Sequence, residues 1–482
     1  MPDWAAFNDA AARSEPTVFR VRLGRVAEEV VLARLREQGF RTRRLDGMPA
    51  FHQVEEEPYP VSMTFEHWNG LIYVQQASTG VAAPALDPRP GERVLDLCSA
   101  PGGKTAHAAE LMGDTGCLVA SEISENRIRG LLGNMYRLCH TNVLAVAGDG
   151  RTFPGGAMFD RVLVDAPCTG EGTLRRRGGR PPRQSPSFLG YVTAAQHALL
   201  QRAVELTRPG GVILYVTCTF APEENEAVVS RILSELPVEL EPLDLPVPHA
   251  PGLTSFDGQR FDPRLEGAAR IYPYHLDSGG LFLAKLRRKD GPAGPSSERS
   301  VESGEGWTPV PAAFPDEGPT ASEPEEADAL VSRAVEELVG RFGVDAGALD
   351  RFSWTVRGGR VWMHSVDSWP LESWPDGGWR PISIGLRAVE FDTRGRARPT
   401  NDVLRLLSGE VTERRVDLDE ASCRSFLGRQ PVQTPLDFRG PIAVRYQGDV
   451  IGRGALTGDG LKTEIPKARA HDLLRVMEKK DG

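Results

Sequence analysis

The sequence predicts a doubly wound α/β fold, in which helices cover both faces of a mostly parallel sheet. From Gly91 onward, short β-rich runs alternate with helical stretches, and each run ends in a loop. Residues able to do chemistry follow directly after these runs, where ligands bind in such sheets. The expected strands are 93–97, 117–121, 142–148, 161–165, 210–217 and 281–286, and the expected helices are 104–112, 125–138, 192–207 and 223–235.

The length of 482 residues favours several domains over a single core. Ahead of the α/β domain, a strand at 18–23 and a helix at 26–38 predict a small α+β unit. After it, one amphipathic helical pattern at 329–343 precedes strand-like pieces. We expect five parts: an α+β unit (1–88), the α/β domain (89–289), a linker (290–328), a small mixed subdomain (329–385) and a β-rich domain (386–482).

The linker is defined by its composition, which is rich in Pro, Gly, Ser and Glu and poor in residues that build a core. It holds ten acidic residues and one basic residue, so it alone accounts for the net charge of -9, and the rest of the chain balances at 56 of each sign. The overall negative charge therefore does not exclude a nucleic-acid partner.

Six cysteines without a CxxC pair are too few for a disulfide scaffold and indicate free thiols in a reducing cytosol. No run reaches the roughly 18 apolar residues of a membrane helix, and the start of the chain lacks a secretory pattern. The histidines and cysteines lack metal-ligand spacing. We expect a cytoplasmic protein with no membrane and no metal partner.

The first expected strand runs into DLCSAPGGKT at 96–105. This differs from the phosphate loop GxxxxGK[ST], because Cys98 stands where that motif needs its first glycine. The dinucleotide pattern GxGxxG is also absent. A tight strand-to-helix turn for another nucleotide-like ligand remains the interpretation.

Two acids follow the next two strands: Glu122 after the second and Asp149 after the third. In such sheets an acid at the second strand end holds a ribose hydroxyl pair, and Asp149 could hold an adenine. Either acid alone is more often a helix cap. Their order along the chain favours a ligand site.

Two cysteines follow the fourth and fifth strands, Cys168 in DAPCTGEG and Cys218 in TCTFAPEENE. A lone cysteine of this kind is usually a small buried residue. If the two strands are neighbours about 4.8 Å apart, however, both thiols lie at one edge of the sheet. We therefore expect them to act together.

These three motifs in this order resemble the signature motifs of the Nop/Sun family of RNA cytosine-5 methyltransferases. IYVQQAS at 72–78 and RIYPYHLDSGGLFLAKL at 270–286 are similar to flanking segments of that family. The resemblance covers about residues 18–288 and implies a Rossmann-like class I methyltransferase fold with S-adenosylmethionine as cofactor. Departures from the usual family pattern are Ser99 after Cys98, and Glu122 where Asp is common.

The resemblance also implies a reaction. Carbon 5 of cytosine accepts a methyl group only after a thiolate adds to carbon 6. The family nucleophile corresponds to Cys218, while Cys168 assists product release and Asp165 stabilises charge on the base. Chemistry alone leaves the choice between the cysteines open, since DNA cytosine methyltransferases use the PC motif. The residues expected to bind the cofactor are Cys98, Ser99, Ala100, Pro101, Gly102, Gly103, Lys104, Glu122, Arg127, Asp149 and Asp165.

RNA contacts are expected at both ends of the chain and beside the catalytic loop. The segment 386–482 resembles a PUA-like RNA-binding module of family members that act on ribosomal RNA, and the unit 1–88 would bind RNA as well. Five tryptophans could stack on bases, although filling a β-rich core is favoured. A basic run after DAPCTGEG suggests a phosphate track. The tryptophans are 354, 362, 369, 374 and 379, and the basic run contains Arg175, Arg176, Arg177, Arg180 and Arg183.

We thus expect a monomeric methyltransferase that modifies cytosine in RNA, with ribosomal RNA favoured over transfer RNA. One alternative is an RNA-binding assembly factor without activity. Another is a DNA cytosine methyltransferase acting through Cys168.

Overall fold

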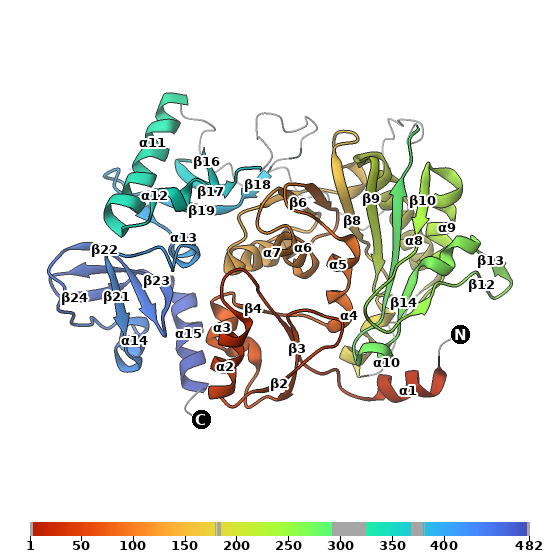
Figure 1. Ribbon diagram of the computed structural model, residues 1–482, viewed down its shortest axis with the longest axis horizontal. Helices are drawn as coiled ribbons and strands as arrows, with labels where there is room; N and C mark the ends of the chain where they lie inside the picture. Colours follow the sequence, from red (N-terminus) through yellow and green to blue (C-terminus); the bar gives the residue numbers. More distant parts are fainter. Residues whose placement is uncertain are drawn as a thin grey trace.

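The computed structural model describes residues 3–178, 180, 185–291, 324–367, 379 and 381–479. In Figure 1 the C-terminal region lies on the left and the sheet that begins at residue 93 in the centre and on the right. The N-terminal strands lie below helices α6 (Gly103–Leu111) and α7 (Glu125–Leu138). Most of the expected linker, residues 292–323, is outside the described residues.

The N-terminal unit is a four-stranded antiparallel sheet in the order β2-β3-β1-β4. All four side chains of its first strand are buried, and Phe19 and Val21 share a core with Val31 and Leu35 of the first long helix. The expected strand and helix are therefore both present. The elements are α1 (Trp4–Ala12), β1 (Val18–Val21), α2 (Glu28–Glu37), β2 (Arg41–Arg44), β3 (Phe51–Glu56), α3 (Phe65–Trp68), β4 (Ile72–Val74), α4 (Ala77–Gly80) and α5 (Ala82–Leu86).

The central sheet has ten strands in the order β11-β14-β15-β9-β8-β5-β6-β7-β18, with β10 paired to β15. Strands β9, β8, β5, β6 and β7 run parallel. The elements are β5 (Arg93–Asp96), α6 (Gly103–Leu111), β6 (Cys117–Glu122), α7 (Glu125–Leu138), β7 (Val143–Ala147), β8 (Phe159–Asp165), α8 (Pro186–Leu206), β9 (Thr207–Thr217), α9 (Glu226–Glu235), β10 (Val238–Glu241), β11 (Ala250–Pro251), β12 (Ser255–Phe256), β13 (Gln259–Arg260), β14 (Ala269–Ile271), α10 (Pro273–Leu276) and β15 (Leu281–Arg288).

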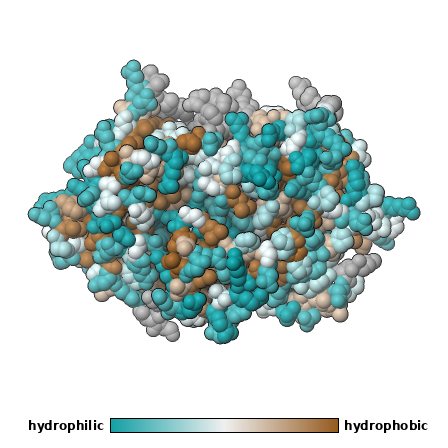
Figure 2. Space-filling view, in the orientation of Figure 1, coloured by the Kyte–Doolittle hydropathy of each residue, from teal (hydrophilic) through white to brown (hydrophobic). Residues whose placement is uncertain are grey.

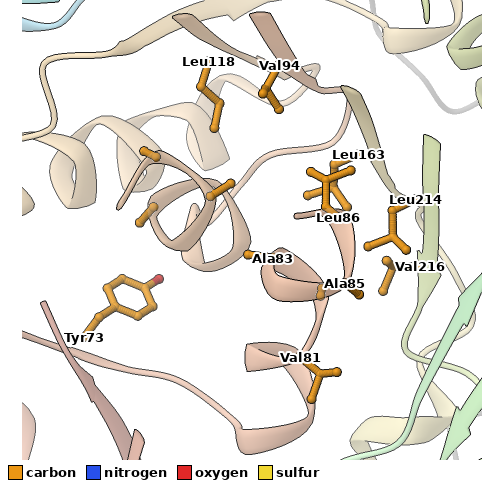
Figure 3. Close-up of a cluster of buried hydrophobic side chains, with 14 of the residues drawn as sticks. Tyr73, Val81, Ala83, Ala85, Leu86, Val94, Leu118, Leu163, Leu214 and Val216 are labelled. Atoms are coloured by element: carbon orange, nitrogen blue, oxygen red, sulfur yellow. The ribbon is translucent and has the colours of Figure 1, made fainter. Parts of the chain in front are cut away.

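Helices cover both faces of this sheet, as the predicted fold requires. On one face α6 and α7 pack against Val94, Leu118 and Leu163, together with Leu86 and other residues of α5. Figure 3 shows Leu163 of β8 beside Leu86 of α5. On the other face α8 and α9 pack on alternate residues of the same strands. Because neighbouring residues of a strand point to opposite faces, a strand covered on both faces is buried along its whole length, as β6 is.

The expected strands and helices match the observed ones closely, and the doubly wound fold class is confirmed. The sheet also contains β10 and β11, which were not among the expected strands, and among the expected elements the largest difference is α8, which begins at Pro186 rather than at residue 192. The hydroxyl of Ser185 accepts a hydrogen bond from the backbone N of Phe188 at 3.2 Å. This cap, with a proline in the first turn, starts the helix earlier than its apolar periodicity indicates.

The C-terminal region is rich in strands, as expected. It forms two four-stranded sheets, β16-β17-β19-β20 and β21-β22-β23-β24. One of its strands, β18, extends the central sheet by pairing antiparallel with β7. The elements are α11 (Pro324–Glu336), a π-helical turn (Glu337–Arg341), α12 (Ala346–Leu349), β16 (Phe352–Arg357), β17 (Arg360–Ser365), β18 (Pro381–Ile384), β19 (Leu386–Phe391), β20 (Ala397–Pro399), α13 (Asn401–Leu406), β21 (Arg415–Leu418), α14 (Glu420–Leu427), β22 (Gly440–Tyr446), β23 (Asp449–Thr457), β24 (Gly460–Thr463) and α15 (Lys467–Lys479).

The five-part division of the chain stays a prediction. Strand β17 lies before the expected boundary between residues 385 and 386, and β19 lies after it. The two strands pair with each other in one sheet, so this boundary would divide a sheet. Trp362 is 2% exposed in the core, and Trp379 packs on Phe153 of the central domain with ring centroids 5.0 Å apart. Trp369 and Trp374 lie outside the described residues.

The surface in Figure 2 is mostly hydrophilic, and hydrophobic residues gather in several separate patches on this face. No helix in the described part of the chain has the length and apolar character needed to cross a membrane. Within the same residues, no group of three or more His, Cys, Asp or Glu side chains is arranged to hold a metal ion.

Candidate active site

The two expected cysteines meet at the carboxyl edge of the central sheet. Strands β8 and β9 are parallel neighbours, with Asp165 opposite Val216. The loops that leave them bring the Sγ atoms of Cys168 and Cys218 to 3.2 Å from each other. Both cysteines are half-buried and neither forms a disulfide. One thiol can therefore donate a hydrogen bond to the other.

A buried carboxylate holds the two cysteine loops together. Glu224, which is 0% exposed, accepts hydrogen bonds from the backbone N of Thr169 at 3.0 Å and from Nε2 of Gln196 at 2.9 Å. The Thr169 hydroxyl also donates to Glu224 and lies 2.9 Å from the Thr219 hydroxyl. The residue after each cysteine is thus tied to one anchor. Glu224 belongs to the motif PEENE at 222–226, and the acidic residues of this motif could have indicated the anchor from the sequence.

The surroundings shift the pKa values of the two thiols in opposite directions. The hydrogen bond from Cys168 lowers the pKa of Cys218, and the nearby Lys104 cation lowers it further against burial and Asp165. The pKa of Cys168 lies well above its ordinary value because it bonds to Cys218 and is buried. Cys218 is therefore the thiol of the pair that loses its proton more readily.

Lys104 and Asp165 form an ion pair beside the thiols. The Nζ of Lys104 lies 2.7 Å from Oδ2 of Asp165, and the two side chains are 12% and 27% exposed. Burial lowers the pKa of Lys104, but the neighbouring Asp165 carboxylate outweighs it and the net pKa is raised. Lys104 is therefore a fixed cation at this site. It comes from the first turn of α6 and Asp165 from the end of β8, so the tertiary fold brings two motifs together.

The glycine-rich loop before α6 turns as tightly as its sequence predicts. Gly102 has φ +102°, and a Cβ there would lie 2.9 Å from side-chain atoms of Leu131 and Met135 on α7. Only glycine suits this position. Inside the loop, Thr105 donates to Oδ2 of Asp96 at 2.8 Å. Burial raises the pKa of Asp96 to about 7.

Glu122 organises the loop from the end of β6. Its side chain is 1% exposed and accepts hydrogen bonds from the backbone N of Ala100 at 3.3 Å and of Ser124 at 2.9 Å. Arg127 pairs with this carboxylate and donates to the Ala100 carbonyl at 2.5 Å. Glu122 and Arg127 thus lie together beside the loop.

Asp149, at the end of β7, is paired with a residue that sequence reasoning missed. Arg151 donates to it from Nε at 2.9 Å and from its backbone N at 3.0 Å. The side chain of Asp149 is 24% exposed. Two carboxylates at consecutive strand ends, next to a glycine turn, can accept hydrogen bonds from hydroxyl and amine groups. The donor set therefore fits a nucleoside-bearing cofactor.

The expected phosphate track is wrong for its first arginine. The Arg175 side chain is 1% exposed and lies 2.9 Å from Asp277, and it donates to the Ser14 carbonyl at 2.7 Å. It therefore fastens the N-terminal segment instead of facing solvent. Arg176 is exposed and pairs with Glu15 at 3.3 Å, and Arg180 is exposed. The Arg177 side chain and Arg183 lie outside what the structure describes.

Comparisons with known proteins reveal relatives of this chain. The family model described as 16S rRNA methyltransferase RsmB/F matches residues 83–287. The ribosomal RNA small subunit methyltransferase F of Aeromonas salmonicida (strain A449) is 30% identical over 429 residues, covering 86% of this chain and 82% of that protein. The 28S rRNA (cytosine-C(5))-methyltransferase of Mus musculus is 36% identical over 242 residues, covering 49% of this chain and 30% of that protein. The solved structure of a methyltransferase homolog from Pyrococcus horikoshii is 33% identical to this chain, with a TM-score of 0.53. The match covers 59% of this chain and 90% of the solved chain.

Proposed function

The chain belongs to the RsmB/F family of 16S rRNA methyltransferases, and from this premise we propose that it methylates a cytosine of ribosomal RNA through a covalent bond to Cys218. It is an S-adenosylmethionine-dependent RNA cytosine-5 methyltransferase, like the relatives it resembles. Ribosomal RNA is the substrate named for the relative that matches along most of the chain.

The role of Cys218 is supported by one observation above all. The Sγ atoms of Cys168 and Cys218 lie within hydrogen-bond distance at 3.2 Å, and this contact lowers the pKa of Cys218. The Cys218 thiolate adds to carbon 6 of cytosine, and electron density moves to carbon 5. When bound, S-adenosylmethionine supplies an electrophilic methyl group to that carbon. Loss of the carbon 5 proton to a base and elimination of Cys218 then restore the aromatic ring.

Cys168 has two roles in this proposal. Before attack, its S–H stabilises the neighbouring thiolate. After methylation, it assists elimination of Cys218 from carbon 6, which its contact distance allows. Asp165 hydrogen-bonds ring nitrogen 3 or the exocyclic amine, and Lys104 balances the charge of Asp165 and of the Cys218 thiolate.

The cofactor-binding roles follow the strand ends. The loop from Cys98 to Lys104 would hold the methionine and ribose portions of S-adenosylmethionine. Glu122 would accept the ribose hydroxyls, with Arg127 keeping its carboxylate in place, and Asp149 would hold the adenine. The geometry around Gly102 supports these assignments. We also propose that the enzyme acts as a monomer in a reducing cytosol, where its six free thiols persist.

Trapping with a fluorinated substrate tests the proposal. Incubation with S-adenosylmethionine and small-subunit ribosomal RNA containing 5-fluorocytosine should give a stable adduct on the Cys218 peptide, because fluorine cannot leave as a proton does. Cys218→Ala should form no adduct, whereas Cys168→Ala should form one that persists even with unmodified RNA. Attachment to Cys168 would overturn the assignment. Bisulfite mapping of RNA from cells lacking the protein separates the substrates, since loss of methylation in transfer RNA alone would refute the ribosomal target.

A further inference from the structure

A separate cavity of about 350 Å³ lies where three parts of the chain meet. Trp68 of the N-terminal unit and Tyr136 of α7 line it, together with residues of β19, α13, β23 and α15, among them Arg405 and Arg469. Its volume falls in the range of about 300–1,000 Å³ that holds small ligands. It contains none of the expected catalytic or cofactor-binding residues.

The acidic residues of this cavity are already neutralised. Glu390 pairs with Arg360 at 3.3 Å, and Asp402 pairs with Arg405 at 3.4 Å. Glu464 contacts both Arg398 and Arg453. In contrast, Arg469 lines the cavity half-buried, and within the described ranges no carboxylate pairs with it. The lining therefore keeps a positive charge that an anion can balance.

Arg469 belongs to a cluster of arginines that lie close to one another. Burial lowers the pKa of Arg137 to about 10; Tyr73 opposes this shift, and the nearby charges of Arg405 and Arg469 add to it. Arg405 is 1% exposed, and its Nε has no hydrogen-bond partner among the described residues, like Nε1 of the lining residue Trp68. An anionic ligand rich in hydrogen-bond acceptors would reduce the repulsion between the arginines and would accept hydrogen bonds from the two unpaired N–H groups.

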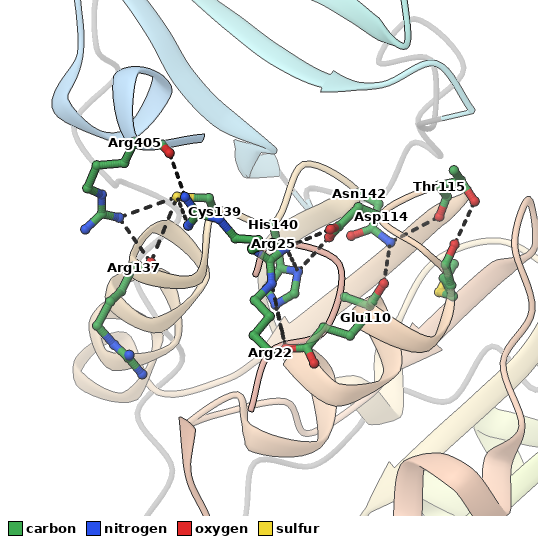
Figure 4. A network of polar contacts seen from close by, with 12 residues as sticks. Arg22, Arg25, Glu110, Asp114, Thr115, Arg137, Cys139, His140, Asn142 and Arg405 are labelled. Atoms are coloured by element: carbon green, nitrogen blue, oxygen red, sulfur yellow. Dashed lines mark hydrogen bonds and ion pairs between the residues drawn. The ribbon is translucent and has the colours of Figure 1, made fainter. Parts of the chain in front are cut away.

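Helix α7 connects this cavity to the candidate active site. From the first turn of α7, Arg127 donates to the Ala100 carbonyl at 2.5 Å, and from its C-terminal half Asn134 donates to the Pro101 carbonyl at 2.9 Å. At the other end, Arg405 donates to the Tyr136 carbonyl at 2.9 Å and the Arg137 carbonyl at 3.1 Å. Figure 4 shows Arg405, Arg137 and Cys139 together at this end, with the ion pair of Arg22 and Asp114 in the same view. The cavity is thus held in a fixed position relative to the cofactor loop.

We propose that this cavity binds one nucleotide of the RNA substrate by its phosphodiester, at a position away from the methylated cytosine. The inference rests on the proposed function. Arg469 contacts the phosphate, while the paired carboxylates and Asn401 face the ribose hydroxyls. A volume of about 350 Å³ suits a single nucleotide unit better than an extended acidic peptide. This second contact fixes the register of the RNA relative to Cys218.

Arg469→Gln tests the proposal, with Arg475→Gln as its matched control on the exposed side of the same helix. Affinity for a small-subunit ribosomal RNA fragment is measured by fluorescence anisotropy at several salt concentrations. Arg469→Gln should weaken binding about three- to tenfold and reduce the slope of log K against log salt by about one. Arg475→Gln should match wild type. Methyl transfer at saturating RNA should keep its kcat in both variants while KM rises only in Arg469→Gln.

The outcomes separate this inference from the proposed function. If wild type transfers methyl groups and Arg469→Gln binds RNA with unchanged affinity and salt slope, the cavity assignment is wrong and the proposed function stands. If wild type forms no adduct with ribosomal RNA, the proposed function itself fails. Calorimetry with adenosine monophosphate and with inorganic phosphate adds a further arm. Binding of either that Arg469→Gln abolishes, with RNA affinity unchanged, would assign the cavity to a free anion and refute the RNA contact. Unchanged thermal unfolding of both variants shows that they fold.

Discussion

The Sγ atom of Cys168 lies 3.2 Å from the Sγ atom of Cys218, and this contact shifts the pKa values of the two thiols in opposite directions. The pKa of Cys168 is raised and that of Cys218 is lowered, so Cys218 is the thiol that loses its proton more readily. Two residues of one chemical type therefore differ in acidity through their surroundings.

Cys168→Ala should shift the pH dependence of adduct formation. Without the hydrogen bond, the pKa of Cys218 rises, so less thiolate is present at a given pH. The acidic limb of the single-turnover rate of adduct formation should therefore move to higher pH. Cys168→Ser, which keeps a hydroxyl donor, should lie between the variant and wild type. An acidic limb at the same pH in all three proteins would contradict the proposed stabilisation.

Lys104→Met should slow adduct formation at neutral pH by about tenfold or more. The Nζ of Lys104 lies 2.7 Å from Asp165, and its positive charge lowers the pKa of Cys218. Because the substitution removes this charge, the pKa of Cys218 should rise. Raising the pH should recover part of the loss, since the thiolate then forms without help. Lys104→Arg keeps the charge and should be less affected. The measurement is the rate of the fluorinated adduct from pH 6 to 9, and a pH-independent loss would argue against an effect on Cys218.

Glu224→Gln should disturb the cysteine loops. A neutral amide cannot accept all three hydrogen bonds that Thr169 and Gln196 give to this buried carboxylate. We expect a loss of about 1–3 kcal/mol in the free energy of unfolding and slower adduct formation. Binding of S-adenosylmethionine, measured by calorimetry, should change little. The exposed neighbour Glu223 supplies the control, Glu223→Gln, and equal effects of both substitutions would refute the anchoring role.

Asp96→Asn should change how stability depends on pH. Burial raises the pKa of Asp96 to about 7 in the folded protein, whereas the unfolded chain has an ordinary value near 3.9. Between these values the folded state holds one more proton, so stability is fully present below the lower pKa and is lost as pH rises toward 7. This group alone contributes a loss of up to about 1.4 kcal/mol per pH unit.

Thermal unfolding from pH 4.5 to 7.5 checks this expectation. Asp96→Asn lacks the titrating group, so its unfolding temperature should fall less with rising pH than that of wild type. Asp244→Asn, at an exposed position, should follow wild type. Parallel curves for Asp96→Asn and wild type would show that Asp96 titrates normally.

Much of the fold and of the candidate site was predictable from the order of residues. Apolar runs such as 117–120 appear within buried strands, because a strand covered on both faces is apolar along most of its length. The motifs after β5, β6, β8 and β9 lie at one edge, because the carboxyl ends of parallel strands meet there. Local patterns and one topological rule therefore account for the convergence of Cys168 and Cys218.

Contacts between distant segments were decided by the tertiary structure. The basic run predicted a phosphate contact for Arg175, but Asp277 and the Ser14 carbonyl bury its guanidinium. The pairing of β18 with β7 joins segments more than 200 positions apart, and the cavity at Arg469 draws on three parts of the chain. Which thiol keeps the proton also depends on partners such as Lys104. Charge, burial and pKa are set by neighbours in space, and a periodic pattern along the chain carries no information about those neighbours.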